Sequence, residues 1–387
     1  MLSSSPTVVR SSAALAHIEV DVPALRRNAA QLRTIAAPAR FAAVVKANAY
    51  GHGLAGVAEA LEREVDLFCV YRAQEGHEIR ARGIETPVLV LGPVTPSELA
   101  GALEAHLAIT LWDTQGYRDD VIRTARESGR PFPVHVKIDT GVTRFGLPAE
   151  RATAALREDL REPALGLEGV FTHLAAVEEL ESAFTTQQLE RFETALRPLE
   201  SELRRRGVRK HAAASAATML FPELRLDLVR VGIATYGVWP SPETQDALRQ
   251  PINLEPALSW RTELIVIQEV PAGTPVGYGC TFSTARPSRI GVLPIGYAEG
   301  IPRAASNRGA VLVHGRRAPI VGRVCMNVTM VDVTDIPQAH PGSTTTLIGL
   351  DGEERLRAED WAAWCGTIGY EIVARLPAEI PRVYRAE

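Results

Sequence analysis

Residues 41–71 read FAAVVKANAYGHGLAGVAEALEREVDLFCVY and contain one strand–helix–strand unit. The runs 41–47 and 66–71 are apolar on both faces, which is typical of strands in a buried parallel sheet. Between them, residues 53–64 have the apolar spacing of a helix. Because parallel strands need a crossover connection, this stretch predicts a β–α–β unit.

The same alternation continues along the first two-thirds of the chain. Further strands are predicted at 87–92, 107–112, 133–139, 167–174, 210–215 and 228–235. The other helices are predicted at 72–83, 96–106, 114–128, 149–160 and 182–206. Eight strands with intervening helices in about 200 residues are typical of an α/β fold of the (β/α)8 TIM-type barrel. A doubly wound open sheet is the alternative, but no GxGxxG motif follows the first strand.

The pattern changes near residue 240. The stretch 238–258 is rich in proline and is typical of a linker. After it, strands are predicted at 260–270, 289–297, 310–314, 318–325, 328–333 and 344–349, with one helix at 357–376. We therefore expect a barrel over 14–240, a smaller, mainly antiparallel β domain over 241–387, and an N-terminal segment, 1–13, that joins the β domain.

The composition limits the classes of function. The formal net charge of −4 gives no electrostatic reason to expect binding to nucleic acid or to an anionic membrane. No apolar run approaches the ~20 residues of a membrane helix, and the N-terminus lacks the layout of a signal peptide. The cysteines form no CxxC pair, so neither a metal site nor a disulfide framework is expected in what we predict to be a cytoplasmic protein.

Lysine is scarce in this chain. Lysine and arginine together number 42, but the only lysines are Lys46, Lys137 and Lys210. Arginine supplies nearly every other cation, so a lysine kept in an apolar strand context is a candidate for a role that needs an amine. Only an amine can bond covalently to an aldehyde, and burial shifts its pKa readily. The chance survival of three lysines is the alternative.

The segment VVKANAYGHG at 44–53 places Lys46 at the end of the first predicted strand, the end at which barrel enzymes build their sites. A lysine in a desolvated barrel mouth loses its proton readily and can attack an aldehyde. Tyr50 follows in the next loop, where its hydroxyl can donate to a phosphate, and Gly51 and Gly53 allow a ligand to approach the backbone closely. A lysine that merely ends a strand before a glycine turn is the alternative.

The stretch AVVKANAYGHG at 43–53 resembles the cofactor-lysine motif of the alanine racemase family, whose members are fold-type III pyridoxal-phosphate enzymes. Further motifs follow in the family's order, from IEVD at 18–21 to PRVYR at 381–385. The resemblance implies that Lys46 carries pyridoxal 5'-phosphate. It also implies that the protein interconverts L-alanine and D-alanine and so supplies D-alanine for cell-wall precursors.

The resemblance assigns roles to residues that follow the later barrel strands. Arg144, in KIDTGVTR at 137–144, would clamp the substrate carboxylate, a task that suits a guanidinium. His173 would lie near the cofactor ring, although a structural histidine is the alternative. Arg230 would face the pyridine nitrogen as a group that keeps its proton. The family often has Met where this chain has Val142.

Barrel enzymes often bind phosphate at the loops after strands seven and eight. By resemblance, these loops and two phenols would bind the cofactor phosphate through Ser215, Gly232, Ile233, Tyr50 and Tyr370. Many relatives have Asn just before the serine, whereas this chain has Ala214.

Racemisation needs a base on each face of the reacting carbon. The resemblance implies that Lys46 acts on the D-isomer and Tyr278, in PVGYGCT at 275–281, on the L-isomer. A tyrosine needs a cationic environment, such as His173 and Arg230, to act as a base. From the residues alone, a strand tyrosine between flexible glycines is the alternative.

Two more segments match the family, IGYAEG at 295–300 and GRVCMNV at 322–328. Tyr297 would narrow access to the site, and the Met326 amide would bind the substrate carboxylate. Other matching positions of the access corridor are Glu178, Arg303, Arg323 and Ile368. Asn327 and Glu178 each stand where relatives have Asp, which changes the charge pattern that bears on substrate preference.

In the family the enzyme is a head-to-tail homodimer, and each active site takes the equivalents of Tyr278 and Met326 from the partner chain. We therefore expect a homodimer with shared active sites that binds a small-molecule amino acid.

Lys137 lies on the fifth predicted strand, seven residues before Arg144. If both side chains point to the barrel mouth, two cations repel one another there. Carbon dioxide adding to the amine would make a carbamate, an anion that accepts hydrogen bonds from Arg144. The family's equivalent lysine is often modified in this way. The alternative is that Lys137 points away, to Asp139 or to solvent.

Three rival functions are considered. They are a racemase that prefers serine or a broad range of substrates, a pyridoxal-phosphate decarboxylase of basic amino acids, and a small single-barrel protein that only binds the cofactor. The segments VGYG at 276–279 and CMNVTMVD at 325–332 argue against the decarboxylase. The residues after 240 argue against the small barrel, which lacks such a domain.

Overall fold

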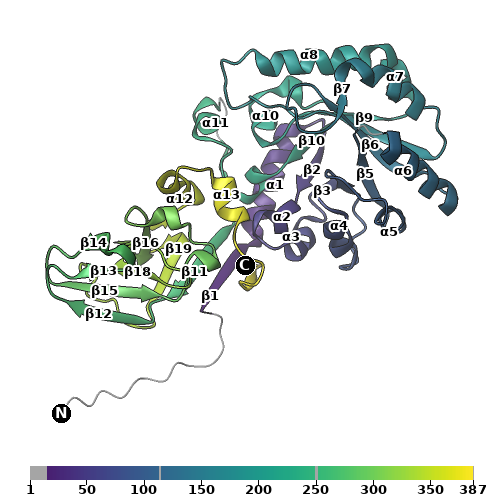
Figure 1. The fold of residues 1–387 in the computed structure, drawn as a ribbon. Helices are drawn as coiled ribbons and strands as arrows, with labels where there is room; N and C mark the ends of the chain where they lie inside the picture. The colour runs from purple at the N-terminus through teal and green to yellow at the C-terminus, as the bar shows by residue number, and fades with distance from the viewer. Residues whose placement is uncertain (1–14, 113–114, 249–251, 387) are drawn as a thin grey trace. The chain divides into compact units, whose positions relative to one another are not determined.

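The computed structural model describes residues 15–112, 115–248 and 252–386, and the chain forms two compact units, both drawn in Figure 1. Among the described residues, the barrel unit comprises those of 20–258, 366–375 and 384–386, and the β unit those of 15–19, 259–365 and 376–383. The barrel unit thus extends beyond the boundary predicted at 240, and it also includes the segment 366–375 from near the C-terminus. The predicted N-terminal segment 1–13 lies outside the described residues.

The barrel unit is built on eight parallel strands in the order β10-β2-β3-β4-β5-β6-β8-β9, as the barrel prediction requires. They are β2 (Arg40–Val44), β3 (Leu67–Val70), β4 (Val88–Val90), β5 (Leu107–Leu111), β6 (Phe132–Asp139), β8 (Leu165–Phe171), β9 (Arg209–His211) and β10 (Leu228–Val231), with the short β7 (Leu147–Pro148) beside β6. Hydrogen bonds from the Asp227 amide to the Lys210 carbonyl (3.0 Å) and from the Arg230 amide to the Ala213 carbonyl (2.9 Å) connect the two end strands. These bonds bring the sheet close to a closed ring.

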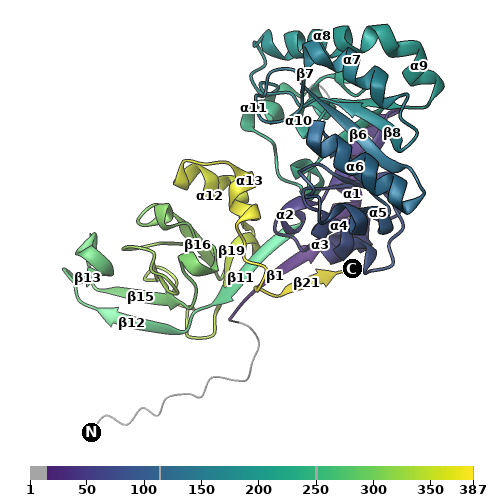
Figure 2. The same ribbon diagram turned by 45° about the vertical axis from the view of Figure 1, so that its right-hand side comes forward.

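The barrel unit also contains helices, several of which pack on the outside of these strands (Figure 2). They are α1 (Val22–Ala36), α2 (Lys46–Tyr50), α3 (Leu54–Leu61), α4 (Ala73–Arg80), α5 (Leu99–Glu104), α6 (Gln115–Ser128), α7 (Ala149–Asp159), α8 (Phe184–Leu196), α9 (Glu200–Arg205), α10 (Ser215–Leu220), α11 (Pro242–Ala247) and α13 (Gly369–Ala374). The first shows the local logic: Asp21 accepts a hydrogen bond from the Ala24 amide (2.7 Å) and caps α1, which then buries Leu25 and Leu32.

The β unit holds a sheet of strand order β17-β16-β19-β11-β1-β21, with β20 beside β19, a three-stranded antiparallel sheet β12-β15-β18, and the hairpin β13-β14. The bounds are β1 (Ala16–Asp21), β11 (Leu258–Glu263), β12 (Val266–Val270), β13 (Pro275–Val276), β14 (Phe282–Ser283), β15 (Ser288–Leu293), β16 (Ala310–Val313), β17 (Arg316–Pro319), β18 (Thr329–Asp332), β19 (Thr344–Asp351), β20 (Glu354–Leu356) and β21 (Arg382–Arg385). Its helix α12 (Ala358–Cys365) buries Trp361. The mainly antiparallel domain is therefore confirmed.

The prediction of one continuous helix over 357–376 was wrong. This stretch is divided into α12 and α13 at Gly366, whose φ of +68° is left-handed and ends the first helix. The second piece, α13, carries Tyr370 and belongs to the barrel unit.

Several predicted strands are shorter than the apolar runs that suggested them. Strand 167–174 ends at Phe171, 228–235 at Val231 and 210–215 at His211. The predicted strands 260–270 and 318–325 are likewise interrupted, and the linker contains α11. Apolar residues beyond a strand end are buried in the loops, so their pattern does not mark where backbone pairing stops.

Candidate active site

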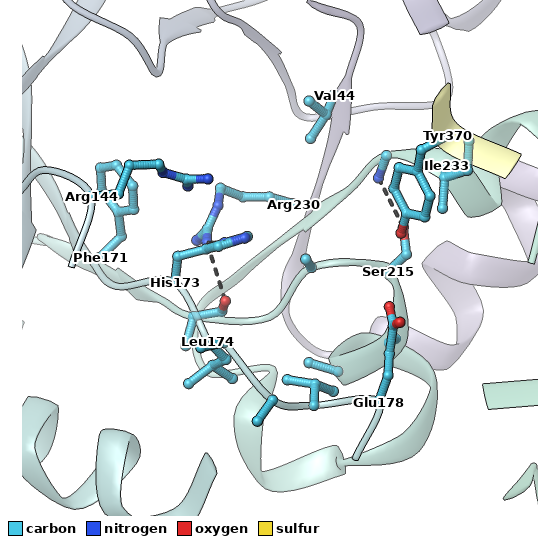
Figure 3. A pocket seen from close by; sticks show the side chains of 18 of the residues that line it. Val44, Arg144, Phe171, His173, Leu174, Glu178, Ser215, Arg230, Ile233 and Tyr370 are labelled. Atoms are coloured by element: carbon cyan, nitrogen blue, oxygen red, sulfur yellow. Dashed lines mark hydrogen bonds between the residues drawn. The ribbon is translucent and has the colours of Figure 1, made fainter. Parts of the chain in front are cut away.

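A cavity of about 1200 Å³ lies in the barrel unit, at residues that follow the carboxyl ends of the strands. Its lining includes the predicted residues Lys46, Tyr50, Lys137, Arg144, His173, Glu178, Ser215, Arg230, Gly232, Ile233 and Tyr370. Figure 3 shows Arg144, His173 and Arg230 grouped on one side of this pocket, and Ser215, Ile233 and Tyr370 on the other. The pocket thus has a cationic side and a side rich in hydroxyl groups.

Lys46 lies just beyond β2, at the start of an unusual turn. The four residues from Ala47 to Tyr50 all have positive φ, between 51° and 54°. None of the four is glycine, and the left-handed conformation costs roughly 1–2 kcal/mol for each such residue. Side-chain bonds offset this cost, among them one from the Leu54 amide to the Asn48 side-chain oxygen (2.8 Å).

Glu75, at the start of α4, also holds this turn. Its carboxylate accepts from the Ala47 amide at 2.7 Å and from the Tyr71 amide, also at 2.7 Å. One carboxylate therefore ties the loop that follows β2 to the loop that follows β3. Burial lowers the pKa of Lys46, and the nearby Arg144 cation lowers it further. Both effects favour the neutral amine, the form that acts as a nucleophile or a base.

Tyr50 points its hydroxyl at the backbone of Gly232. A side-chain carbon at position 232 would lie 2.5 Å from that oxygen, so only glycine fits there. The Tyr50 ring packs on Tyr236 (centroids 5.1 Å apart), whose hydroxyl donates to the Val44 carbonyl at 2.9 Å. Burial raises the pKa of Tyr50, which keeps its phenol protonated and able to donate.

Ser215 begins α10 and faces the turn after β10. Its side-chain oxygen accepts from the amides of Gly232 (3.1 Å) and Ala234 (3.4 Å). The hydroxyl proton remains available to a ligand. Tyr370 packs near Tyr50, with ring centroids 6.2 Å apart, and burial raises its pKa as well. Three hydroxyl donors and glycine backbone therefore meet here, the kind of surface that binds a phosphate.

Arg230, on β10, is buried and held from several directions. It donates to the Thr172 carbonyl (2.8 Å), the Ala212 carbonyl (3.1 Å) and Nδ1 of His211 (2.8 Å). Burial lowers its pKa to about 10, so it stays cationic at neutral pH. A fixed guanidinium in this pocket can only donate hydrogen bonds.

His173 lies in the loop after β8. Burial, followed by the charge of Arg230, lowers its pKa to about 3. Both effects favour the neutral imidazole, so the fixed positive charge on this side of the pocket comes from Arg230.

Asp139 ends β6 and shapes the loop that carries Arg144. Its carboxylate accepts hydrogen bonds from the Gly141 and Val142 amides (both 2.9 Å) and from the Arg144 amide (3.2 Å). This is a carboxylate-capped turn, and it presents the Arg144 side chain to the pocket.

Lys137 points into the pocket and not toward solvent. Its amine donates to the Phe145 carbonyl and lies 4.0 Å from the centroid of the Phe145 ring. Burial and the Arg144 charge lower its pKa to about 8. The alternative of a lysine directed to solvent is therefore wrong.

Glu178 lines the same pocket, and its pKa is raised by burial and by Glu243. Two glutamates, Glu178 and Glu243, therefore lie close to one another in the lining of this pocket.

Of the remaining predicted residues, Ile368 belongs to the barrel unit, and Tyr278, Tyr297, Arg303, Arg323 and Met326 lie in the β unit. Tyr278 starts the short 3-10 turn η4 (Tyr278–Cys280) and is 75% exposed, and Met326 is 56% exposed. The backbone brings Tyr297 and Met326 to adjacent loops, because the Tyr297 amide donates to Cys325 (3.0 Å). The pocket described above is lined by residues of the barrel unit.

Asn327 has a physical explanation in the β unit. Its side-chain amide donates to the Glu299 carboxylate at 2.7 Å, while that carboxylate also accepts from the Gly296 amide at 2.8 Å. An aspartate at position 327 would bring two anions together. The asparagine at position 327, where relatives have Asp, is therefore compatible with the neighbouring Glu299 carboxylate.

The sequence reasoning missed Glu75, Asp139 as a loop anchor, and Tyr236. Asp139 lies two residues before Gly141, a spacing typical of a turn, and Glu75 occupies the third position of a helix. Nothing in the local sequence marks Tyr236, whose partners lie far along the chain.

Within the described ranges, no helix is long and apolar enough to cross a membrane, and no cluster of metal-binding side chains is found.

Comparison with known proteins agrees with this geometry. The alanine racemase N-terminal domain matches residues 20–240, and the alanine racemase C-terminal domain matches residues 257–384. The alanine racemase of Symbiobacterium thermophilum is 42% identical over 373 residues, which cover 95% of this chain and 97% of the relative. That of Methanococcus maripaludis is 38% identical, with coverage of 95% and 97%.

Solved structures give the same result. An alanine racemase from Clostridium difficile has a TM-score of 0.88 at 32% identity and covers 97% of each chain. The Bacillus anthracis alanine racemase with bound L-Ala-P has a TM-score of 0.87 at 34% identity, covering 98% of this chain and 97% of the other.

Proposed function

The chain belongs to the alanine racemase family and is an isomerase, and on this premise we propose that it interconverts L-alanine and D-alanine with pyridoxal 5'-phosphate bound in the barrel pocket. The observation that carries the proposal is the barrel pocket itself. It combines a desolvated lysine, a clamped arginine and a hydroxyl-rich glycine turn.

The pocket fits this cofactor residue by residue. The amine of Lys46 would hold its aldehyde carbon, and Arg230 would donate to its ring nitrogen from a fixed position. The phosphate would be bound by the hydroxyl-rich side of the pocket, through Tyr50, Ser215, Tyr370 and the backbone of Gly232 and Ile233. When bound, the cofactor withdraws electrons from the substrate Cα and so weakens the Cα–H bond.

Lys46 is the base for the D-isomer. Its neutral amine can accept the α-proton and return it, because burial and Arg144 disfavour the charged form. Glu75 fixes the turn that begins at Ala47 and thereby limits where the lysine amine can reach.

Tyr278 is the base for the L-isomer and comes from the second chain of a head-to-tail homodimer. Its exposure and that of Met326 support this, because large apolar side chains left in solvent are typical of association surfaces. In the dimer, the amide of Met326 binds the substrate carboxylate and Tyr297 narrows access to the site. The barrel thus binds the cofactor, and the β unit completes the site of its partner.

Arg144 clamps the substrate carboxylate, and Lys137 is carbamylated. The pocket-facing Lys137 amine supports this, since a pKa of about 8 leaves part of it neutral and able to add carbon dioxide near neutral pH. The anion formed would accept hydrogen bonds from Arg144 and steady it.

The product D-alanine would supply cell-wall precursor synthesis, and we place the reaction in the cytoplasm. The four cysteines are free, which is usual in a reducing compartment.

The test is direct. The purified protein is incubated with L-alanine, with and without added pyridoxal phosphate, and the enantiomers are separated on a chiral column. We expect D-alanine to approach an equal mixture when the cofactor is present. An unchanged L-alanine sample, or release of carbon dioxide from lysine or arginine, would refute the proposal.

A further inference from the structure

A chain of buried polar side chains crosses the barrel interior behind Arg230. Nδ1 of His211 lies 2.8 Å from an Arg230 terminal nitrogen, and Nε2 of His211 lies 2.9 Å from Nδ1 of His135. Nε2 of His135 faces Glu168, whose carboxylate oxygen is 3.9 Å away, an ion-pair contact that is longer than a hydrogen bond. Both histidine rings are completely buried, whereas the Glu168 side chain is 42% exposed. The chain therefore connects the pocket arginine with solvent.

The groups at the two ends of this series of side chains, Arg230 and Glu168, determine which nitrogen of each histidine carries the proton. A guanidinium only donates, so Nδ1 of His211 must accept and its proton must sit on Nε2. That N–H then donates to Nδ1 of His135, whose own proton must sit on Nε2 and point at Glu168. A carboxylate only accepts, so the donor end and the acceptor end require the same pair of tautomers.

The strands are built to accommodate this arrangement. The pairing of β6 with β8 is irregular at this point: Val134 pairs with Leu167 and His135 with Gly169, so Glu168 is the extra residue of a bulge. Bulges re-aim side chains. A side-chain carbon at Gly169 would overlap the His135 ring, so the ring is possible only beside a glycine.

Charge and burial support neutral histidines. Burial lowers the pKa of His211 and of His135; Arg230 lowers that of His211 further, whereas Glu168 opposes the effect of burial on His135. At the outer end, Glu168 also pairs with Arg209 at 3.2 Å, and the contact with His135 lowers the pKa of its carboxyl. Glu168 is therefore an anion that can accept at the end of the chain.

We propose that Glu168 and His135 are positioning residues that act through His211 to fix the orientation of Arg230. With an acceptor at the outer end, both histidines keep their protons on Nε2, and His211 always offers Arg230 a lone pair. Without the carboxylate, the buried N–H of His135 faces no negative charge, the opposite tautomers become competitive, and two N–H groups then face each other at Arg230. The inference rests on the proposed function only for its consequence in catalysis.

The test reads the tautomers directly in the cofactor-free protein. Nitrogen NMR of ¹⁵N-histidine-labelled protein distinguishes a protonated Nε2 from a protonated Nδ1, and His211→Gln and His135→Gln assign the two rings. We expect both rings of the wild type to be neutral with the proton on Nε2. A His211 protonated on Nδ1, or on both nitrogens, would overturn the proposal whatever the variants do.

Variants at the outer end separate positioning from mere support of the fold. Glu168→Ala should give mixed tautomers at His135 and His211, whereas Glu168→Gln, which keeps an accepting oxygen, should resemble the wild type. Glu200→Ala is the matched control, because Glu200 pairs with Lys210 and is similarly exposed. Identical tautomers in Glu168→Ala and the wild type would contradict the proposal.

Gly169→Ala tests the same chain without altering any charge. It should displace the His135 ring and change its tautomer in the same direction as Glu168→Ala. If the spectrum of His135 is unaffected, the ring is not held as we infer.

A kinetic arm distinguishes this proposal from the proposed function. In the loaded enzyme, Glu168→Ala should lower kcat about three- to tenfold, the effect of one lost hydrogen bond, with Glu168→Gln near the wild type. The expected tautomers in a protein that does not racemise alanine would refute the function and support the relay. Racemisation of alanine by a wild-type protein with other tautomers would support the function and refute the positioning role of Glu168 and His135.

Discussion

The two units present their predicted site residues in opposite ways. In the barrel unit, Lys137, Ser215 and Arg230 are each less than 5% exposed and have hydrogen-bond partners. In the β unit, Tyr278 and Met326 are 75% and 56% exposed. A buried, bonded set can bind a ligand with little rearrangement, whereas an exposed set needs another surface to define its environment. This difference is what the proposed function requires, in which the barrel pocket of one chain is completed by the exposed residues of a partner's β unit.

Removing the barrel amine should have the largest effect. Lys46→Ala should lower racemisation by at least about 10⁴-fold, the upper end of what a general base contributes, because the cofactor attachment is lost as well. Borohydride should fix pyridoxal phosphate covalently to Lys46 in the wild type and to no residue of the variant. Lys210→Ala, which removes a lysine paired with Glu200, is the control and should keep full activity. A label on Lys137 or Lys210 would contradict the assignment.

Removing the phenol from the β unit should be the next largest effect. Tyr278→Phe should slow racemisation about 10²–10⁴-fold, the usual contribution of a general base. Exchange of the α-proton with solvent deuterium should survive better from D-alanine than from L-alanine. Tyr117→Phe, a barrel tyrosine that packs on Trp112, is the matched control. Equal loss of exchange from both enantiomers would argue against two separate bases.

Lys137→Ala should lower activity by about 10-fold, the scale of a charge-assisted hydrogen bond lost from Arg144. Short carboxylates should restore part of the activity, because they can occupy the place of the carbamate. Since the pKa of the free amine is about 8, its neutral fraction falls below that pH, and at a fixed concentration of dissolved carbon dioxide the depleted enzyme should be reactivated faster above pH 8 than below it. Full activity in Lys137→Ala would refute the modification.

The smallest effect concerns the hydroxyl side of the pocket. Ser215→Ala should weaken cofactor binding about 3- to 10-fold, one hydrogen bond among several, with little change of kcat at saturating cofactor. The Kd for pyridoxal phosphate is measured by fluorescence titration, with Ser128→Ala, remote from the pocket, as control. An unchanged Kd would exclude Ser215 from the phosphate site.

The barrel and its pocket lysine were predictable from the sequence. The alternation that begins at 41–71 predicted the parallel barrel, because strands that are apolar on both faces occur mainly in parallel sheets covered by helices. The motif around Lys46 predicted the pocket lysine, and the scarcity of lysine pointed to the same residue.

The details that hold the pocket together were not predictable. The left-handed turn from Ala47 to Tyr50 is favoured by no local residue preference and depends on Glu75, from a later helix. The neutral state of His173 arises from burial and from Arg230, on another strand. Such properties depend on long-range packing, which a local pattern does not contain.

The measurement that tests the central claim most directly mixes two inactive proteins. Lys46→Ala has an intact β unit, and Tyr278→Phe has an intact barrel pocket. If each site takes its lysine from one chain and its tyrosine from the other, a mixed dimer has one site with both residues and one with neither. We therefore predict that racemisation of L-alanine reappears on mixing, at up to about a quarter of the wild-type rate for random exchange, since half of the dimers would be mixed and each would have one intact site. No recovery, despite subunit exchange shown by native mass spectrometry, would contradict a site shared between chains.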